Sequence, residues 1–533
     1  MGCDKVGVAT TINKTQFGTI KIFNTKGGIF SMIKVPQGLI AILAVFVIQG
    51  CSSLTTERSV VVDDGSHYDK TRLLYRSMVD KDKPEIAKLN LFFTQMPKGG
   101  DIHHHYSGTV YAESYLEWVG LKGWYINQCS LKVEQSKSSN TACPSLTVSQ
   151  VYKDDTTYRK LLTLWSDKDY SNHFHEQPAP DTNFFNTFDY FGDIAHEYTG
   201  LGLKIIKERA IKENVSYIET MLSTVGVNSQ DYFSAATVKQ LNLALSAAST
   251  DQELYVLFDS IVNTLTSNPK FSTELQSFLN SVDTYHQEID DDQFLMRYQT
   301  YGVRVLPPLQ VFTDLFSGYL AAEKSPLVVG VNIVAPENNV VSLKDYTLHM
   351  KMYQYLRAKH PSVNRALHAG ELTLGMVRPK DLNFHIDQAL NIAGAQRIGH
   401  GVDIPYESGS VELLQQLKDQ AAIEINLTSN EFILGVEKQE HPYIIYSNFG
   451  VPLVIATDDS GVSRNNLSNE YMLLASRYRP TYDMIKSYAY NSIKYSFMDK
   501  PSKDLIIDNL NKRFLAFEQE MATLYDTFTL GER

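Results

Sequence analysis

Short apolar runs that alternate with helical stretches most constrain the fold of this chain. One run ends near His103, and seven more follow at residues 217–222, 303–309, 327–334, 365–368, 397–400, 421–427 and 452–457. The spacing between runs in the second half leaves room for one helix after each run. Repeating strand–helix units form a parallel sheet, and eight units predict a closed (β/α)8 TIM barrel, an α/β fold.

Three segments depart from this alternation. Residues 68–93 have a helical pattern and predict an N-terminal helical extension, whereas residues 232–299 form a longer helical stretch that elaborates the barrel. Residues 121–183 are polar and rich in Ser, Asn and Asp, so we expect a loop insertion after the first strand. Residues 68–533 are therefore predicted to form one elaborated barrel.

The N-terminal region carries an export pattern. Residues 38–48 are almost entirely apolar, too short for a membrane span of about 20 residues but suited to the core of a signal peptide. The following Gly50-Cys51-Ser52 resembles the lipobox of bacterial lipoproteins, in which the cysteine is lipidated. We expect residues 1–50 to be a leader, with Met32 as an alternative start, and residues 51–67 to be a flexible tether.

This pattern predicts an exported protein that is attached to the cell envelope by a lipid on Cys51. Ser52 in place of Asp favours the outer membrane, facing the periplasm, in a Gram-negative cell. The alternatives are an uncleaved anchor and a chance apolar run. Membrane association through the lipid anchor alone is expected, because the apolar run is too short to span the bilayer.

The four cysteines divide in the same way. Cys3 precedes the proposed start and Cys51 would be lipidated, which leaves Cys129 and Cys143 in a polar stretch. In an oxidising compartment these two can form a disulfide, worth about 3 kcal/mol in the chain-entropy account. The alternative is two free thiols.

Polar residues at the ends of the apolar runs suggest chemistry, because TIM barrels place their active sites at the carboxyl ends of the strands. His103 and His105 lie two residues apart and project to one face of a strand, while His104 points away and is expected to pack or to face solvent. Two imidazoles on one face can hold a metal ion. The alternative is a set of polar loop histidines.

Two further runs end in histidine. His368 closes one run, Gly370 permits a close approach of the backbone, and Glu371 lies where a general acid or base would be needed. His400 sits between two glycines at the end of another run. The simpler interpretations are a polar strand terminus and a buried histidine with satisfied hydrogen bonds.

Asp458 and Asp459 follow a further apolar run, and buried carboxylates are costly unless they are paired or bound to a metal. A turn or capping role is the simpler interpretation of Asp459. Three histidines and one aspartate at strand ends suit zinc, although Fe²⁺, Co²⁺ and Mn²⁺ accept the same ligands. Bound zinc would leave one position for water and lower the pKa of that water toward about 7.

The net charge argues against one class of binding partner. Lys and Arg number 49 and Asp and Glu number 60, which gives a charge of −11. A nucleic-acid partner is not expected, because binding the phosphate backbone needs a basic surface.

The order and spacing of MPKGGDIHHHYSG, HAGE, RIGHG, LTSN and TDDSG resemble the adenosine deaminase family, part of the metal-dependent amidohydrolase superfamily. The resemblance extends from about residue 88 to residue 514. The MPKGG segment, the cysteine-bearing insertion and NSIKYS at 491–496 look most like the secreted, growth-factor-type branch. The resemblance implies zinc-dependent hydrolysis of adenosine or 2′-deoxyadenosine to inosine or 2′-deoxyinosine and ammonia, with one Zn²⁺ per chain.

The resemblance also implies roles for single residues. The zinc ligands would be His103, His105, His368 and Asp458. Glu371 would carry a proton to purine N1, His400 would orient the attacking hydroxide, and Asp459 would hydrogen-bond purine N7. The backbone at Ala335 and Gly370 would contact the purine.

Two positions depart from the family pattern. Tyr106 follows His105 where the family usually has an acidic residue that holds the ribose, and Ala335 stands at a position where a glycine is common. Two alternatives therefore remain, namely a deaminase of another aminopurine or related nucleoside, and a non-catalytic surface lipoprotein. Residues 68–93 could mediate a homodimer or pack against the barrel.

Overall fold

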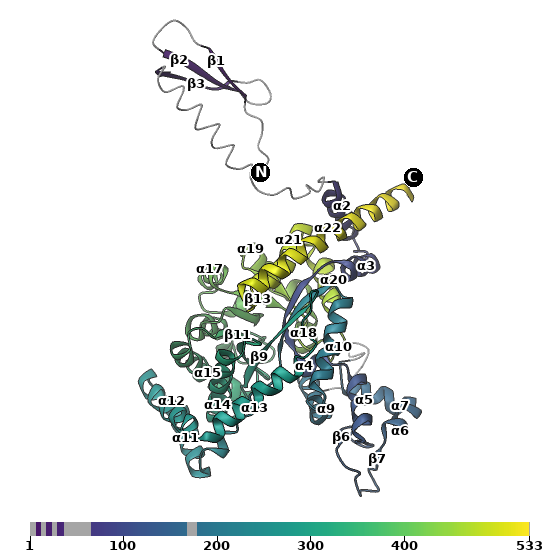
Figure 1. Ribbon diagram of the computed structural model, residues 1–533, viewed down its shortest axis with the longest axis vertical. Helices are drawn as coiled ribbons and strands as arrows, with labels where there is room; N and C mark the ends of the chain where they lie inside the picture. Colours follow the sequence, from purple (N-terminus) through teal and green to yellow (C-terminus); the bar gives the residue numbers. More distant parts are fainter. Residues whose placement is uncertain (1–6, 12–16, 24–28, 37–65, 168–177, 532–533) are drawn as a thin grey trace. The chain divides into compact units, whose positions relative to one another are not determined.

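The computed structural model describes residues 7–11, 17–23, 29–36, 66–167 and 178–531 and divides the chain into two units, residues 1–65 and 66–533 (Figure 1). In the first unit, three antiparallel strands form a sheet: β1 (Gly7–Thr11), β2 (Phe17–Phe23) and β3 (Ile29–Pro36). Met32 lies in β3. The apolar run 38–48 and Cys51 lie outside the described residues.

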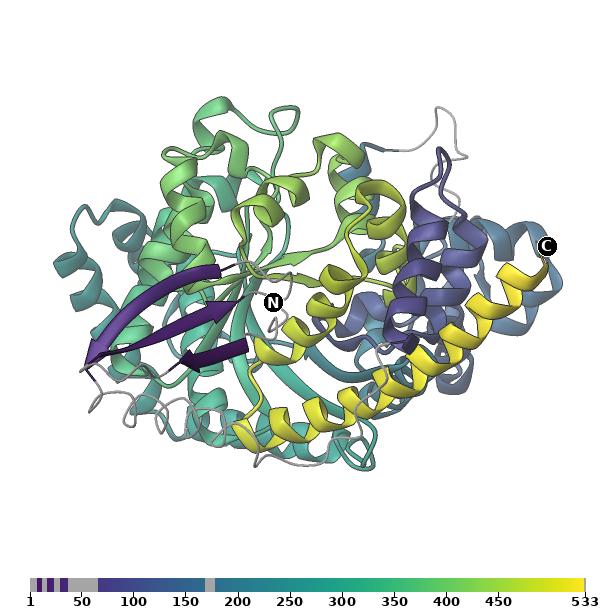
Figure 2. The ribbon, with the colours of Figure 1, turned by 90° about the horizontal axis from the view of Figure 1, so that it is seen from above.

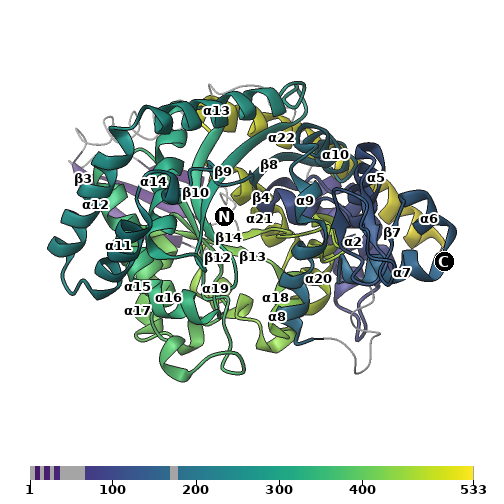
Figure 3. The ribbon, with the colours of Figure 1, turned by 90° about the horizontal axis from the view of Figure 1, so that it is seen from below.

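The second unit confirms the predicted TIM barrel. Eight strands pair in parallel in chain order: β4 (Gly99–His105), β8 (Val215–Met221), β9 (Leu295–Val303), β10 (Val328–Val334), β11 (Asn364–Ala369), β12 (Arg397–His400), β13 (Ala422–Ile425) and β14 (Leu453–Ile455). Helices surround them (Figure 3). The strands are buried along almost their entire length, as expected for a parallel sheet covered on its outer face.

The prediction of a strand at 303–309 was wrong. The strand ends at Val303, and α14 (Pro308–Lys324) begins five residues later. Pro307 and Pro308 explain the difference, because proline lacks an amide hydrogen for a sheet but suits the first turn of a helix. The true strand, β9, begins within the segment assigned to the long helical stretch.

The barrel is closed by backbone hydrogen bonds between its first strand and the segment just after its last. The amide of Asp458 donates to the carbonyl of His103 at 2.9 Å, and the amide of His105 donates to the carbonyl of Asp458 at 3.3 Å. These bonds form a parallel bridge between His104 and Asp458. Closure therefore takes place at residues that carry candidate metal ligands.

A buried ion network lies inside the barrel. Arg397 of β12 donates from Nε to Glu424 at 2.5 Å and from Nη2 to Glu219 at 2.6 Å, and its guanidinium stacks on Phe497. All three charged side chains are essentially inaccessible to solvent. Buried charges are tolerated only when they are paired, so this network ties β8, β12 and β13 together.

The N-terminal extension consists of two helices rather than one. The segment predicted as helical over 68–93 forms α2 (Ser66–Val79) and α3 (Ile86–Gln95), which are separated around Pro84. The helix α2 packs along the C-terminal α22 (Lys500–Gly531) (Figures 1 and 2). Lys70 and Asp526 form an ion pair between the two helices at 2.6 Å. Packing within the chain therefore accounts for α2, while a homodimer stays a prediction.

Most of the remaining helices lie around the barrel (Figure 3). The three that elaborate it between β8 and β9 are α11 (Ala235–Ala247), α12 (Asp251–Thr266) and α13 (Pro269–Tyr285). The others are α4 (Tyr106–Thr109), α5 (Ala112–Lys122), α9 (Phe188–Ala195), α10 (Thr199–Lys212), α15 (Val340–Lys359), α16 (His385–Gln388), α17 (Ser410–Gln420), α18 (Leu427–Leu434), α19 (Tyr443–Phe449), α20 (Leu467–Tyr478) and α21 (Tyr482–Lys494). Among the helices that the structure describes, none is both long and apolar enough to span a membrane.

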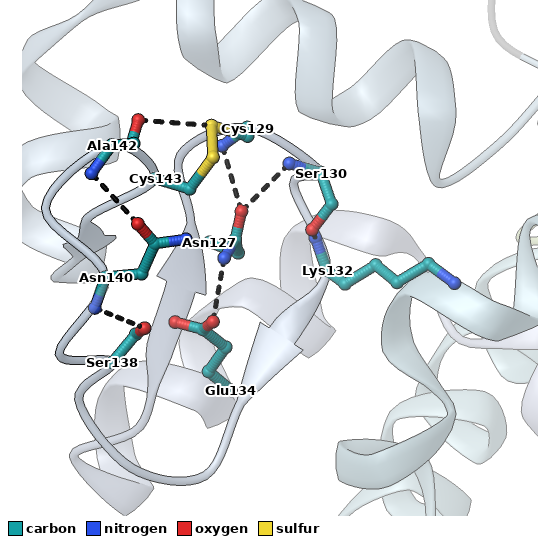
Figure 4. The surroundings of a disulfide bond; sticks show 9 residues. All are labelled: Asn127, Cys129, Ser130, Lys132, Glu134, Ser138, Asn140, Ala142 and Cys143. Carbon is teal, nitrogen blue, oxygen red and sulfur yellow. Dashed lines mark hydrogen bonds between the residues drawn. A yellow bond between two sulfur atoms is a disulfide. The ribbon is translucent and has the colours of Figure 1, made fainter.

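The insertion after β4 has structure of its own. It contains a small antiparallel sheet of β5 (Tyr125–Asn127), β6 (Val133–Glu134) and β7 (Ser145–Leu146), followed by α6 (Val148–Lys153), α7 (Asp155–Leu164) and α8 (Pro180–Asn186). A disulfide joins Cys129 to Cys143, and the Asn127 side chain accepts the amides of Cys129 and Ser130 (Figure 4).

The insertion reaches the loops at the carboxyl end of the barrel. The amide of Asp167 donates to the carbonyl of Val462 at 2.8 Å, after β14. The Asn338 side chain, after β10, donates to Asp181 at 2.7 Å. The insertion therefore borders the face on which TIM barrels carry their active sites.

Candidate metal centre

The four predicted ligands meet at the carboxyl end of the barrel. His103 and His105 come from β4, His368 from β11 and Asp458 from the segment after β14, and their ligand atoms lie within 4.8 Å of one another. His105 Nε2 is 3.1 Å from both His368 Nε2 and Asp458 Oδ1. Two residues on β4 can contribute together because alternate strand residues share a face.

The donor set fits a divalent metal ion. His103 Nε2 and Asp458 Oδ1 are buried, and within the described part of the chain neither has a hydrogen-bonding partner. Buried polar atoms without a partner are costly, and an ion between them would satisfy both. Three imidazole nitrogens and a carboxylate oxygen are ligands that zinc accepts.

Three further residues orient these ligands. Glu424 Oε2 lies 2.6 Å from His103 Nδ1, and Asn332 Oδ1 lies 2.9 Å from His368 Nδ1. Each oxygen accepts the Nδ1 proton, so the Nε2 lone pair of each histidine faces the ligand cluster. Ser429 Oγ donates to Asp458 Oδ2 at 2.7 Å.

Sequence reasoning missed these orienting roles. Glu424 did carry a signal, since it is a charged residue within the apolar run of β13 and must therefore be paired when buried. Asn332 lies within the apolar run 327–334 and Ser429 within the LTSN motif, and nothing else in the sequence indicated their roles. His104, expected to point away, is buried with its Nδ1 2.9 Å from Thr220 Oγ1 and contributes no ligand to the cluster.

Glu371 is held by its backbone. The amides of Gly370 and Glu371 donate to the Glu337 carboxylate at 3.1 and 2.9 Å, so the Gly370 amide already has an acceptor within the protein. Burial, together with the nearby carboxylates of Asp458 and Glu337, raises the pKa of the Glu371 carboxyl well above its ordinary value. Glu371 can therefore hold a proton at neutral pH.

His400 lies at the end of β12 with a left-handed backbone (φ 69°). Its Nε2 is buried, 3.9 Å from Asp458 Oδ2, and has no hydrogen-bonding partner among the described residues. Its Nδ1 lies 3.7 Å from Glu371 Oε1. His400 thus borders both the ligand cluster and the candidate acid.

Besides Gly370, the two other predicted purine contacts differ in their surroundings. Asp459 is buried beside Gly108, where any side chain would collide with its carboxylate, and burial raises the pKa of Asp459. Ala335 adopts φ 84°, a conformation that favours glycine. The backbone after β10 therefore keeps a glycine-like shape although the residue is alanine.

Together these groups combine a metal site with a buried proton carrier and two further polar side chains. Such an arrangement can activate water and transfer a proton to a substrate.

Comparison with known proteins agrees with the fold. The family model described as adenosine deaminase matches residues 319–513. An adenosine deaminase of Enterococcus faecalis is 30% identical over 160 residues, covering 30% of this chain and 44% of that protein. An N6-methyl-AMP deaminase of Danio rerio is 31% identical over 170 residues, covering 31% and 45%. The chain thus spans less than half the length of these relatives.

One solved structure shares the fold over most of this chain. The crystal structure of an arabidopsis N6-mAMP deaminase has a TM-score of 0.51, with 17% identity, and covers 79% of this chain and 99% of that chain. This likeness shows a shared fold. The family match over residues 319–513 includes β10 to β14, and with them His368, Glu371, His400 and Asp458.

Removing the Asn332 oxygen that accepts the Nδ1 proton of His368 should weaken metal binding. We expect Asn332→Leu to lower the affinity for Zn²⁺ by about 10–100-fold, because the Nδ1 proton of His368 loses its partner and the ring loses its orientation. Asn332→Asp keeps an acceptor and should retain the affinity. Competition with a zinc-binding dye measures both, and equal affinities for the two variants would contradict this role of Asn332.

Proposed function

We propose that this chain belongs to the adenosine deaminase family and is a zinc-dependent hydrolase that converts adenosine or 2′-deoxyadenosine into inosine or 2′-deoxyinosine and ammonia. The observation that carries the proposal is the convergence of four ligand atoms beside a buried, protonatable Glu371. One Zn²⁺ held by His103, His105, His368 and Asp458 would lower the pKa of a water molecule toward about 7 and supply the nucleophile at neutral pH.

Glu371 would supply the proton that the ring needs. Addition of water at C6 moves negative charge onto N1, and a protonated carboxyl at N1 removes the cost of that charge. Burial favours the protonated form of Glu371, and Glu337 holds its backbone in place. The amino group then gains the proton that the added hydroxyl gives up, the C6 carbonyl forms, and ammonia leaves.

His400 and Asp459 would each hydrogen-bond one further polar atom of the reactants. His400 presents Nε2 toward the ligand cluster and would steady the oxygen that attacks C6. Purine N7 is a hydrogen-bond acceptor, so Asp459 must bind it in the protonated form, which burial favours.

A different aminated purine is the second candidate substrate, and one observation supports it. Tyr106 is fully buried and its hydroxyl donates to the carbonyl of Ala195 at 3.1 Å, so it offers nothing in place of the usual acidic ribose contact. The relatives also include N6-methyl-AMP deaminases. The non-catalytic alternative is disfavoured because every ligand and the acid are present.

We also propose that the protein is exported and held at the cell envelope, on the outer membrane, by a lipid on Cys51. The sequence pattern around Cys51 supports the lipid, and the Cys129–Cys143 disulfide supports an oxidising compartment.

Replacing the acid should remove most of the activity. We expect Glu371→Gln to lower kcat by about 10²–10⁴-fold, because the amide cannot deliver a proton to N1. Zinc content should stay unchanged, since Glu371 is outside the four-ligand cluster. Glu412→Gln, an exposed position on α17, is the matched control.

A substrate panel of adenosine, 2′-deoxyadenosine, AMP and N6-methyl-AMP, followed by ammonia release, measures this effect and ranks the candidates. Undiminished turnover by Glu371→Gln, or no turnover of any compound by the zinc-loaded wild type, would overturn the proposal.

Lipidation is tested separately. We expect cells that express the full chain to incorporate labelled palmitate into the protein, and Cys51→Ala to abolish the label and release the protein from the membrane fraction. Cys3→Ala is the control and should keep the label. A protein that stays unlabelled, or a Cys51→Ala variant that is still labelled, would refute the anchor.

A further inference from the structure

The LTSN motif and a histidine downstream of it form a hydrogen-bonded chain behind His400. Asn430 Nδ2 lies 2.9 Å from His400 Nδ1, and Asn430 Oδ1 lies 3.0 Å from His441 Nε2. The chain ends at the backbone amide of Tyr443, which lies 3.1 Å from His441 Nδ1. The three side chains are buried, so water does not compete for these bonds.

The backbone amide fixes the direction of every bond in this chain. An amide N–H can only donate, so His441 Nδ1 accepts and its single proton is on Nε2. Burial lowers the pKa of His441 to about 3, which is consistent with one proton on this ring at neutral pH. Nε2–H then donates to Asn430 Oδ1, and the Asn430 amide group must donate to His400 Nδ1.

The hydrogen bond that His400 Nδ1 accepts determines the protonation of the other ring nitrogen, Nε2. With Nδ1 occupied as an acceptor, the proton of the neutral ring must be on Nε2. This nitrogen is the one that faces Asp458, and it has no partner among the described residues. Asn426 Nδ2, at 3.4 Å from the same Nδ1, acts in the same direction.

The tautomer matters because His400 could otherwise bind the metal ion. Two overlapping candidate clusters share Asp458, one with the three histidine ligands and one with Glu371 and His400. An imidazole nitrogen binds a metal only when it carries no proton. A protonated Nε2 can only donate a hydrogen bond, so it is excluded as a ligand and available to an oxygen in the site.

We propose that Asn430 and His441 are positioning residues, which hold His400 in the tautomer protonated on Nε2 and so keep it out of the metal's ligand set. The catalytic meaning of this arrangement rests on the proposed deamination, in which His400 steadies the attacking oxygen. The tautomer itself does not depend on that reaction.

A buried carboxylate holds the start of the helix that carries Asn430. The carboxylate of Glu470, on α20, accepts the amides of Leu427 and Thr428 at the start of α18, at 2.7 and 3.2 Å. The same helix start carries Ser429, which donates to Asp458, and Asn430. One helix terminus therefore orients both a metal ligand and His400.

Asn430→Asp reverses the chain and is the sharpest test. Aspartate has no donor, so it would accept from His441 Nε2 and from His400 Nδ1, and the proton of His400 would move to Nδ1. His441→Gln is the matched control, because glutamine can still donate to Asn430 Oδ1. Nitrogen-15 NMR of the histidine-labelled, zinc-loaded proteins reads which ring nitrogen of His400 is protonated.

We expect protonated Nε2 in the wild type and in His441→Gln, and protonated Nδ1 in Asn430→Asp. We also expect kcat of Asn430→Asp to fall by about 10²–10³-fold, as for the loss of a single transition-state donor, with little change in KM. The visible spectrum of Co²⁺-loaded Asn430→Asp should differ from that of the wild type, because the freed Nε2 can enter the metal's coordination sphere.

The wild-type spectrum alone decides the tautomer, even if Asn430→Asp fails to fold. Protonated Nδ1 in the wild type, or an unchanged tautomer in a folded Asn430→Asp, would overturn the inference. The two proposals fail separately. A wild type that shows the expected tautomer but turns over no purine would contradict the deamination and leave the hydrogen-bonded chain intact.

Discussion

The pairing between β4 and the segment after β14 is the interaction on which the site depends. Residues at opposite ends of the barrel sequence become neighbours through two backbone hydrogen bonds between His103, His105 and Asp458. The same closure places the side chains of these residues within ligand distance of one another. The metal centre therefore depends on how the barrel closes, since a barrel that closed in another register would separate the ligands.

A shared carboxylate connects this closure to the barrel interior. Glu424 accepts from Arg397 on one oxygen and from His103 on the other, and Arg397 also binds Glu219. Buried charges of this kind add little net stability compared with apolar packing, but removing one partner leaves the others uncompensated. The network is better understood as fixing the orientation of His103, and the hydrogen bonds through Asn430 do the same for the neighbouring ring of His400.

Much of the architecture could be predicted from the sequence, because strand–helix alternation and the two-residue period of a strand are local properties. The placement of His103 and His105 on one face followed from that period. The prediction of a strand at 303–309 was wrong because its two prolines stand at the start of a helix. The prediction of one helix over 68–93 was wrong because the helix is interrupted around Pro84. The charge of Glu424 within an apolar run indicated that it must be paired, but the partners of Glu424, Asn332 and His441 come from other strands and helices, and no local pattern identifies them.

In the proposed reaction, water replaces the amino group of a purine nucleoside at the carboxyl end of this barrel. The most direct measurement is the reaction of the zinc-loaded protein with adenosine in ¹⁸O-labelled water, followed by mass spectrometry of the product and an assay of ammonia. Hydrolysis at C6 predicts inosine with one labelled oxygen and one ammonia for each adenosine consumed. Unchanged adenosine, or a product without the label, would contradict it.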